Sequence, residues 1–555
     1  MQQDNRKRDI ISIILFAFIA FYCTWPLFIH HGLPYIDDMV FHSFQAHQFD
    51  RGIRDGVIYP RWIPDANNGY GSPNFIFYSP LSYYLVSITA LFTRSLTTAM
   101  IIVIWVGFFL SGFTMFITTK KMFGGSGNPL PAIIYQILPF HLGDLYIRGT
   151  FAELFAFVCF PLIILFMHET IESRNKMAMV GLSISYAGLI LTHLVSAYIF
   201  SIVAGVYFIY KFFLLKDRKP IIEALFSLAL GLGMSAIYLL PVIFDRRFVQ
   251  IDYLLKCNIC DYRNNFLFTF DKFQAGLRSF YLPLHIEVVL EVTLSILTIL
   301  LIRKKRQVLS DTSQHNFFVF LLLFACFLTT PLSKPIWNLI PGFPFLQFPW
   351  RWVTVIELSL CLLTATLFSL KGMSAFRFTD LEKRLFVYLI ITLSLVSLNI
   401  ILEGSHLISK IATTTVNARE YTPIWAGDIK KITAATSMGR VSVVSGEALS
   451  DITEWKSEKR AINIKASTPA VLRISTFYYP GWQARIDGHK AEIMIAKESG
   501  AMLVDIPEGR HKLVLEFEDT PLRYYARIIS LVSLCALVLL VLFSKKSSRN
   551  LTSPI

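Results

Sequence analysis

The sequence predicts a polytopic α-helical membrane protein, with about twelve transmembrane helices and a β-sandwich-like domain outside the membrane. Of its 555 residues, 54% are hydrophobic and only 16% are charged, and the mean hydropathy is +0.53. A water-soluble protein of this size carries fewer apolar residues. Long apolar runs alternate with short Lys and Arg clusters, so membrane topology explains the net charge of +14 better than a nucleic-acid partner does.

The spacing of apolar runs and basic clusters predicts the path of the chain. A helix needs roughly 17 to 25 apolar residues to cross a bilayer, and cytoplasmic loops collect Lys and Arg. The first helix is expected at 10–29, after a basic start, and is not cleaved because no small-residue site follows it. Further crossings are expected at 98–118, 129–145, 151–169, 177–192, 195–214, 221–241, 284–302, 316–332, 353–370, 384–402 and 524–543.

This path places both termini and six basic clusters in the cytoplasm. The stretch 75–92 is apolar enough to cross as well. If it crossed, however, Lys120 and Lys121 would lie outside, against the tendency of basic residues to stay in the cytoplasm. We therefore expect 75–92 to lie on the outer membrane interface.

The block 403–523 has a different pattern. Segments such as 461–465, 471–474 and 512–517 alternate apolar and polar residues, as half-buried strands do, and Asp487-Gly488 marks a turn. The sequence thus divides into a transmembrane domain at 1–402 with an outer loop at 30–97, an extracytoplasmic β-rich domain at 403–523, and a final helix with a cytoplasmic tail at 524–555.

Cys257 and Cys260 form a Cys-x-x-Cys pair in a polar loop. Such a pair favours a local disulfide over free thiols, and a zinc site lacks its other ligands.

The first external loop carries a dense group of polar side chains. Asp37 and Asp38 open an expected helix, on which Asp38 and His42 share one face, and Arg61 follows in the same loop. A structural interpretation is that Asp37 caps the helix and that Asp38 favours its dipole, which is worth about 1 kcal/mol. The density of these groups beside a membrane interface favours a carboxylate that acts as general base.

Two arginines at other outer turns are candidate phosphate ligands. Arg148 and Arg351 could each be interfacial anchors, but a guanidinium near lipid headgroups also suits a lipid-linked phosphate. Glu153 either favours a helix dipole or joins Asp37 or Asp38 around a substrate or divalent ion. His193, alone at an outer hairpin, is more typical of a satisfied polar residue than of a catalyst.

Several motifs are absent from the sequence. It has no Walker loop, no dinucleotide fingerprint, no nucleophile elbow and no His-Glu-x-x-His, which argues against a nucleotide-driven pump. Glu287 and Glu291 are the main ionisable residues inside an expected membrane helix.

Taken together, the motifs resemble the bacterial membrane proteins related to 6-pyruvoyl-tetrahydropterin synthase, which are close to the YfhO-like proteins. The resemblance runs over nearly the whole chain and depends on Asp37-Asp38-x-x-Phe41-His42, Tyr59-Pro60-Arg61-Trp62, Gly69-Tyr70-Gly71, Phe77-Tyr78-x-Pro80-Leu81, Arg148-Gly149-x-x-Ala152-Glu153, Gln347-Phe348-Pro349-Trp350-Arg351 and Phe477-Tyr478-Tyr479-Pro480-Gly481-Trp482 with Asp487-Gly488. Nothing in the sequence offers the His-rich zinc site of a pterin synthase.

The resemblance implies the GT-C architecture of glycosyltransferases that use polyprenyl-phosphate sugars, in the cytoplasmic membrane of a bacterium. In such enzymes an acidic pair lies in the first outer loop and a second acid follows the third membrane helix. Asp37 with Asp38, and Glu153, match these positions, although many members place the second acid within the turn that Arg148-Gly149 occupies here.

The implied reaction is an inverting transfer to a glycan, glycolipid or protein acceptor. Asp37 or Asp38 would be the base, with His42 beside it, and Arg148 and Arg351 would bind the donor phosphate. Glu153, Arg61 and His193 would orient the acceptor, or Asp38 and Glu153 would hold Mg²⁺ or Mn²⁺. The alternatives are a transporter or flippase for a lipid-linked glycan and a non-catalytic protein of cell-envelope assembly.

Overall fold

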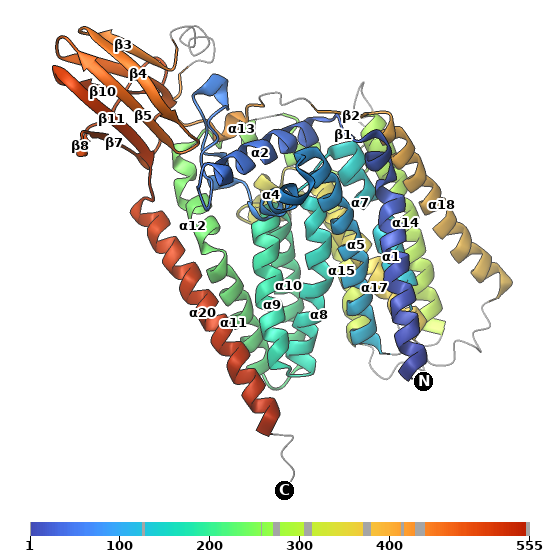
Figure 1. Ribbon diagram of the computed structural model, residues 1–555. Helices are drawn as coiled ribbons and strands as arrows, with labels where there is room; N and C mark the ends of the chain where they lie inside the picture. The colour runs from blue at the N-terminus through green and yellow to red at the C-terminus, as the bar shows by residue number, and fades with distance from the viewer. Residues whose placement is uncertain are drawn as a thin grey trace.

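The computed structural model describes residues 2–124, 128–256, 258–269, 278–304, 313–369, 379–411, 416–427 and 439–550. A long helical bundle carries a β domain at one end, and both ends of the chain lie at the other (Figure 1). We call the end with the β domain the domain face and the opposite end the terminal face.

Ten of the twelve predicted crossings correspond to long apolar helices or to bent pairs of helices. In the described part of the chain, eight helices are long and apolar enough to cross a membrane. They are α1 (Gln2–His30), α5 (Leu96–Phe123), α8 (Ala156–Glu172) with the helical turn Glu153–Phe155 before it, α10 (Leu194–Leu214), α14 (Arg278–Lys304), α17 (Val353–Ser369) with the helical turn Pro349–Trp352 before it, α18 (Asp380–Ser405) and α20 (Pro521–Asn550). Two pairs are bent, by 74° between α11 (Lys219–Met234) and α12 (Ala236–Asp245), and by 89° between α15 (Ser313–Thr329) and α16 (Lys334–Leu339).

The other two predicted crossings are shorter or broken. The stretch 177–192 is α9 (Lys176–Thr192), which has 17 residues. The stretch 129–145 divides into α6 (Leu130–Ile137) and α7 (Pro139–Gly143). Leu138 between them has an extended ψ of 141°, because a residue before proline avoids the helical region.

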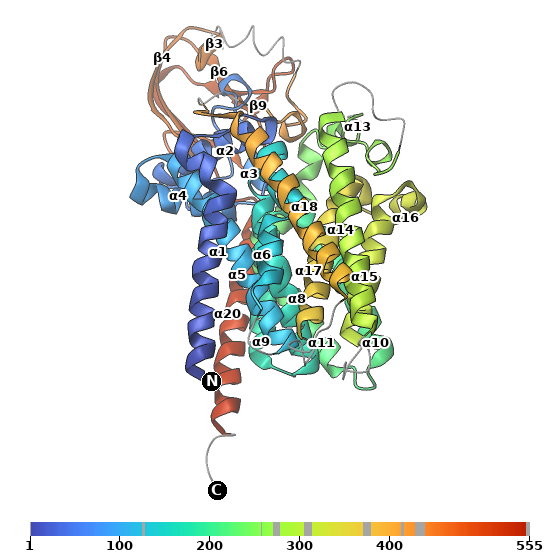
Figure 2. The ribbon, with the colours of Figure 1, turned by 90° about the vertical axis from the view of Figure 1, so that its right-hand side faces the viewer.

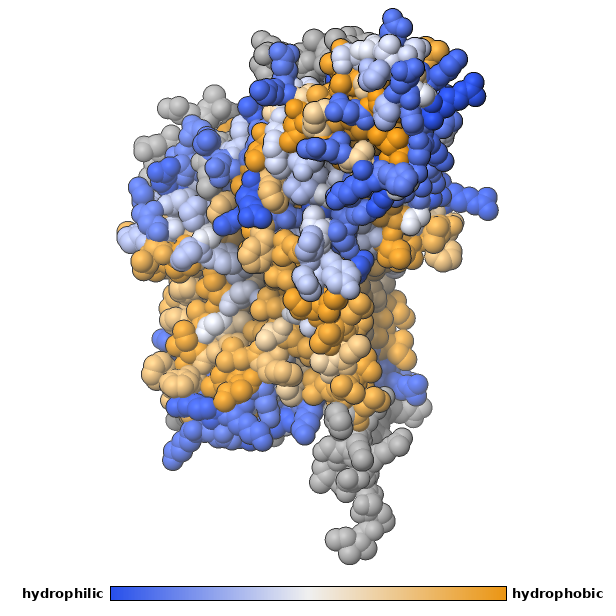
Figure 3. All heavy atoms as spheres, turned by 90° about the vertical axis from the view of Figure 1, so that its left-hand side faces the viewer, coloured by the Kyte–Doolittle hydropathy of each residue, from blue (hydrophilic) through white to orange (hydrophobic). Residues whose placement is uncertain are grey.

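The described basic loops lie together at the terminal face. Lys120 forms an ion pair with Asp9 near the N-terminus, and Arg174 pairs with Asp217. A broad apolar belt separates this hydrophilic end from the domain face (Figure 3). The belt is the surface expected of a membrane domain, and the loops follow the predicted grouping of Lys and Arg.

Two helices run across the domain face, α2 (Asp37–Arg54) and α4 (Leu81–Thr93) (Figure 1). With 13 residues, α4 is too short to cross a bilayer. Tyr83 and Val86 on α4 are buried against the bundle, whereas Leu91 and Phe92 are 66% and 83% exposed. An apolar exposed side at this level suits the membrane interface that the sequence predicts for 75–92.

The β domain is a pair of antiparallel sheets, as the alternating pattern predicts. One sheet has the order β3-β6-β10-β9 and the other β4-β5-β11-β7-β8. The strands are β3 (Val441–Ser445), β4 (Ala448–Trp455), β5 (Lys459–Ala466), β6 (Ala470–Phe477), β7 (Trp482–Ile486), β8 (His489–Ala491), β9 (Met494–Ile495), β10 (Ala501–Ile506) and β11 (Gly509–Phe517). Their buried residues, among them Ile462, Leu472 and Leu513, form a common core.

The first loop connects the β domain to the bundle. Its start, β1 (Leu33–Pro34), pairs with β2 (Ile408–Ser409) just after α18. Its middle enters the β-domain core, where the Trp62 ring lies 5.5 Å from the rings of Trp482 and Phe517. Gly71 has a φ of +83°, and a Cβ there would lie 2.2 Å from Trp62 Nε1, so a larger residue would displace the tryptophan.

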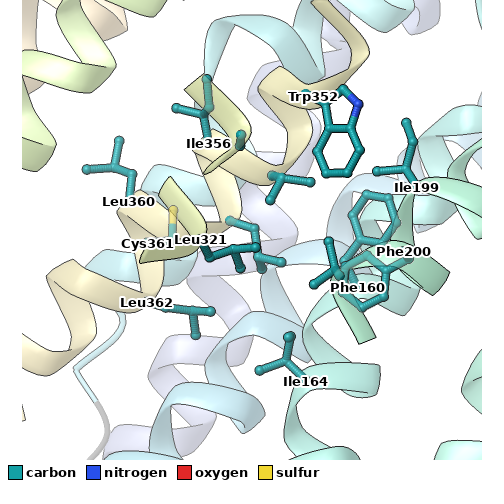
Figure 4. Close-up of a cluster of buried hydrophobic side chains, with 14 of the residues drawn as sticks. Phe160, Ile164, Ile199, Phe200, Leu321, Trp352, Ile356, Leu360, Cys361 and Leu362 are labelled. Atoms are coloured by element: carbon teal, nitrogen blue, oxygen red, sulfur yellow. The ribbon is translucent and has the colours of Figure 1, made fainter. Parts of the chain in front are cut away.

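The apolar core of the bundle lies where α8, α10, α15 and α17 meet. Phe160 and Phe200 stack with ring centroids 4.7 Å apart, and Leu321, Trp352 and Ile356 surround them (Figure 4). This core fixes the outer ends of α8, α10 and α17, which carry residues of the candidate site.

Candidate functional site

Charged side chains from five parts of the chain converge on the domain face. They come from α2, from the π-helical turn η2 (Asp144–Arg148), from η3 (Glu153–Phe155), from the α9–α10 hairpin and from the short helix η10 (Pro349–Trp352) that leads into α17. We call this group the charged cluster, and its members are Asp38, His42, Asp144, Arg148, Glu153, His193 and Arg351.

Arg148 is fixed by two buried carboxylates. Its Nη1 donates to Asp144, and its Nη2 donates to Glu153 Oε2 at 2.8 Å. The guanidinium also lies 4.6 Å from the centre of the Trp350 ring, a favourable cation–π contact. Burial alone would lower the pKa of Arg148, but the charges of Asp144, Glu153 and Asp38 raise it. Arg148 is therefore a permanent cation held in one position.

The turn after Arg148 lies against the start of α2. Gly149 has a φ of +72°, and a Cβ on it would lie 2.6 Å from the backbone nitrogen of Met39. This close approach places Asp38 beside Arg148, in agreement with its electrostatic effect on that arginine. Asp38 is exposed, so a substrate can reach its carboxylate. The side chain of Asp37, the other predicted base, lies outside the described residues.

His42 is buried and hydrogen-bonded to tyrosines. Its Nδ1 lies 2.7 Å from the Tyr83 hydroxyl, and its Nε2 lies 3.4 Å from the Tyr78 hydroxyl. Burial, helped by the charge of His193, lowers the pKa of His42 to about 3. The imidazole is therefore neutral at physiological pH and can orient a hydroxyl group without carrying charge.

His193 occupies a similar environment on the other side of the cluster. Its Nδ1 lies 2.7 Å from Ser196 Oγ. Burial lowers its pKa to about 4, although the charge of Glu153 opposes the shift and Arg351 and Arg148 support it. His193 is a satisfied neutral residue in contact with the charges of the cluster.

Arg351 retains donor capacity. Its Nη1 donates to the carbonyl of Leu346 at 2.7 Å, and its guanidinium lies 5.1 Å from the Phe348 ring. Its Nε has no hydrogen-bond partner among the described residues. Arg351 is also within electrostatic range of Glu153 and Asp38. It is the arginine of the cluster with a donor available for an added anion.

Arg61 lies outside the charged cluster. Its Nη1 donates to Asp519 at 2.7 Å, and its backbone nitrogen donates to Glu458 at 2.6 Å. Asp519 lies just after β11, and Glu458 lies just before β5. The contacts of Arg61 thus join the first loop to the β domain.

Sequence reasoning missed three residues in or near the charged cluster. Asp144 is a fully buried acid in an apolar run, and an ionisable residue in a predicted membrane segment is a signal that could have identified it. Burial raises the pKa of Glu420, and the charge of Asp38 adds to the effect. Tyr421 stacks on Phe77, with centroids 5.7 Å apart. Glu420 and Tyr421 come from the block assigned to the β domain, so no local pattern indicated them.

The predicted metal pair, Asp38 with Glu153, fits a cation only in part. Glu153 uses one oxygen to bind Arg148, and its Oε1 has no partner in the described part of the structure. Among the residues that the structure describes, one group of three acids could share a metal ion, and it lies elsewhere, at Glu287, Glu291 and Glu357. The divalent cation at Asp38 stays a prediction. Cys257 lies outside the described residues, so the predicted disulfide stays untested.

The family of the protein follows from its sequence. Residues 75–407 match the 6-pyruvoyl-tetrahydropterin synthase related domain, a membrane-protein family. The chain belongs to this family. The match extends from the stretch before α4 to the end of α18, so it includes Arg148, Glu153, His193 and Arg351 of the charged cluster.

One relative of low identity and several solved structures of low similarity also match the chain. An uncharacterised protein of Lactococcus lactis subsp. cremoris is 24% identical over 257 residues, and the match spans 43% of this chain and 41% of that protein. The mycobacterial arabinofuranosyltransferase AftD gives a TM-score of 0.47 at 12% identity, over 73% of this chain and 27% of AftD.

Two further structures show comparable similarity. ArnT from Cupriavidus metallidurans, bound to undecaprenyl phosphate, gives a TM-score of 0.39 at 10% identity, over 71% of this chain and 75% of ArnT. The Archaeoglobus fulgidus oligosaccharyltransferase gives a TM-score of 0.43 at 11% identity, over 78% of this chain and 58% of the oligosaccharyltransferase chain.

Proposed function

We propose that the protein is a membrane glycosyltransferase that moves a sugar from a polyprenyl-phosphate donor to an acceptor on the outer side of a bacterial cytoplasmic membrane. The observation that carries the proposal is the placement of the exposed Asp38 carboxylate beside buried Arg148 and Arg351. A base, a cation with an available donor at Arg351 and a positioning arginine at Arg148 provide, at one end of a membrane bundle, the groups that this transfer requires.

The orientation follows from the distribution of charge. The basic loops lie at the terminal face, and Lys and Arg are enriched on the cytoplasmic side of membranes. The terminal face, with both chain ends, is then cytoplasmic, and the domain face is external. Nucleotide sugars are absent outside the cytoplasmic membrane, so a lipid-linked sugar is the appropriate donor.

The reaction is an in-line displacement at the anomeric carbon. Asp38 accepts the proton of the acceptor hydroxyl while the acceptor oxygen forms the new glycosidic bond. The bond between the anomeric carbon and the phosphate oxygen breaks, the polyprenyl phosphate leaves with the electron pair, and the configuration inverts. A phosphate is a good leaving group, so a general acid is dispensable.

The two arginines have different roles in this reaction. Arg148 is bound to two carboxylates, which cancel its charge locally, so it acts as a positioning residue that holds the turn against α2. Arg351 has an available donor and binds the departing phosphate. A charge-assisted hydrogen bond of this kind contributes roughly 1.5 to 3 kcal/mol.

The lipid part of the donor fits the exposed side of α4. Leu91 and Phe92 are exposed beside α2, at the level of the interface. Apolar side chains there would contact the polyprenyl chain while the phosphate reaches the charged cluster. His42, a buried residue of α2, orients the hydroxyl groups of Tyr83 and Tyr78 beside the charged cluster.

The test is transfer from a radiolabelled polyprenyl-phosphate sugar by purified Asp38→Asn and Asp37→Asn variants. Loss of a general base lowers turnover by roughly 10² to 10⁴-fold, and we expect that loss for Asp38→Asn. Wild-type turnover in both variants would overturn the proposal. A transporter would instead move the labelled lipid across proteoliposomes without changing it, and that result would also reject glycosyl transfer.

A further inference from the structure

Three glutamates inside the helical bundle lie together. They are Glu287 and Glu291 on α14 and Glu357 on α17, and one oxygen from each lies within 4.8 Å of the others. Their relative exposures are 3%, 0% and 0%. We call them the acidic trio. We propose that the acidic trio binds a divalent metal ion, of the hard type that oxygen ligands select.

The trio comes from two adjacent helices. Glu287, Glu291 and Ser295 follow one another at four-residue intervals, so they share one face of α14. Glu357 lies on α17, which packs directly against α14 (Figure 2). Residues that lie 66 or more positions apart in the chain are thus brought to one point by helix packing.

The surroundings of the trio are apolar. Ile356, Leu360 and Cys361, neighbours of Glu357 on α17, belong to the buried cluster shown in Figure 4. An isolated carboxylate is very costly in such a medium, and three at this separation repel one another strongly. A bound cation or bound protons are needed to make the arrangement stable.

Unpartnered oxygens favour a metal ion. Glu287 accepts a hydrogen bond from the Phe140 peptide N–H. Its Oε1 and both oxygens of Glu291 have no hydrogen-bond partner among the described residues, whereas the His141 peptide N–H is directed at Glu357. One oxygen of each glutamate lies within 4.8 Å of the other two, a spacing at which a single cation can contact all three.

A nearby hydroxyl supplies an independent sign of a ligand. Ser295, one helical turn from Glu291, is fully buried, and its Oγ also lacks a partner in the described structure. Buried hydroxyl groups nearly always form hydrogen bonds. A water molecule on the metal ion would satisfy Ser295 and complete an oxygen shell. Mg²⁺, Mn²⁺ and Ca²⁺ prefer carboxylate, hydroxyl and water oxygens.

The site differs from the charged cluster and does not depend on the proposed transfer. Asp144 is within electrostatic range of both Glu287 and Glu357, and the same Asp144 binds Arg148. The metal ion therefore lies beneath the charged cluster. It lowers the negative electrostatic potential that the acidic trio exerts on the charged cluster. It has a structural and electrostatic role, with no contact to the reacting atoms.

The experiment uses the full chain in detergent micelles, stripped with EDTA and titrated with Mg²⁺, Mn²⁺ or Ca²⁺. We expect the thermal midpoint of the wild type to rise by several degrees, and one Mn²⁺ per chain to be detected by electron paramagnetic resonance. Glu291→Gln and Glu357→Gln should each weaken Mn²⁺ binding by at least about tenfold.

The matched control is Asp245→Asn, which removes a buried acid on α12 that is bound to Arg523 and should leave the Mn²⁺ affinity unchanged. If Glu291→Gln fails to fold, Glu357→Asp keeps the charge and should still lower the affinity. A wild-type midpoint that is the same in EDTA and in metal would overturn the proposal. Equal Mn²⁺ affinity in the wild type and in Glu291→Gln would do so as well.

Discussion

The charged cluster and the acidic trio hold buried carboxylates in two different ways. In the charged cluster, Asp144 and Glu153 share the guanidinium of Arg148. In the acidic trio, Glu287, Glu291 and Glu357 have no arginine, lysine or histidine partner in any ion pair of the described residues. Both groups lie in the same bundle, so the difference comes from their immediate partners.

The comparison shows how the same residue type acquires opposite energetic roles. A carboxylate paired with a fixed arginine is compensated inside the fold, and its removal or the removal of its partner is costly. A carboxylate without a partner depends on something from outside the chain. Substitutions in the charged cluster should therefore destabilise the protein. In the absence of metal, neutral substitutions in the acidic trio should stabilise it.

The largest expected effect is on Arg148. Arg148→Gln leaves Asp144 and Glu153 as two uncompensated buried carboxylates, and we expect a loss of about 3 to 5 kcal/mol in stability. Thermal and denaturant unfolding in detergent would measure it. Glu291→Gln, measured in EDTA, should instead raise the stability of the protein. If Arg148→Gln is as stable as the wild type, the carboxylates take up protons and the contrast between the two groups fails.

The next effect tests the arginine with the available donor. Arg351→Gln should lower kcat/KM for the donor by roughly tenfold to a hundredfold, the value of one charge-assisted hydrogen bond. Its effect on stability should be smaller than that of Arg148→Gln. Arg61→Gln is the control, because Arg61 is bound to Asp519, and it should leave KM within about twofold of the wild type. A larger change in KM for Arg61→Gln would show that Arg61 contacts the substrate, as the sequence predicted.

A third prediction concerns the contact between the first loop and the β domain. Burial raises the pKa of Glu458 to about 7, although the N–H groups of Arg61 and Trp62 oppose the shift. Between the ordinary pKa and about 7, the folded state holds a proton that the unfolded state has lost. Stability should therefore fall as the pH rises through this window, by up to about 3 kcal/mol.

Glu458→Gln should remove that dependence, since the amide does not titrate. The measurement is the thermal midpoint at several pH values, together with hydrogen exchange of the Arg61 and Trp62 amides. The control is Glu454→Gln, which lies in the same domain on exposed ion pairs. An equally steep pH profile in Glu458→Gln would show that another group is responsible.

The fold was largely predictable because its signals are local. Apolar runs of the right length mark the long helices, and the alternation at 461–465 and 512–517 marks strands. The break at Leu138–Pro139 could be suspected from proline chemistry. However, the apolar run continues through it, so hydropathy alone predicted one crossing at 129–145.

The site was predictable where one motif carries the chemistry and unpredictable where packing combines distant residues. Asp38, Arg148 and Arg351 stand out at the outer ends of apolar runs, and the structure brings them together. The contact of Arg61 with Asp519 joins positions more than 450 residues apart, so no sequence pattern reveals it. Glu357 lies on a different helix from Glu287 and Glu291, and only helix packing brings it beside them.

The smallest expected effect concerns the hydrogen bond between His42 and Tyr83, which is neutral, unlike the ion pairs of the charged cluster. Tyr83→Phe removes the hydroxyl that binds His42 Nδ1 and should cost about 1 kcal/mol. Because the pKa of His42 is about 3, the imidazole stays neutral, and the loss should be the same at pH 5 and pH 8. Tyr59→Phe, which removes a bond to the Phe75 carbonyl, is the matched control. A loss that differs between pH 5 and pH 8 only for Tyr83→Phe would mean that His42 titrates, and the charge of the cluster would then depend on pH.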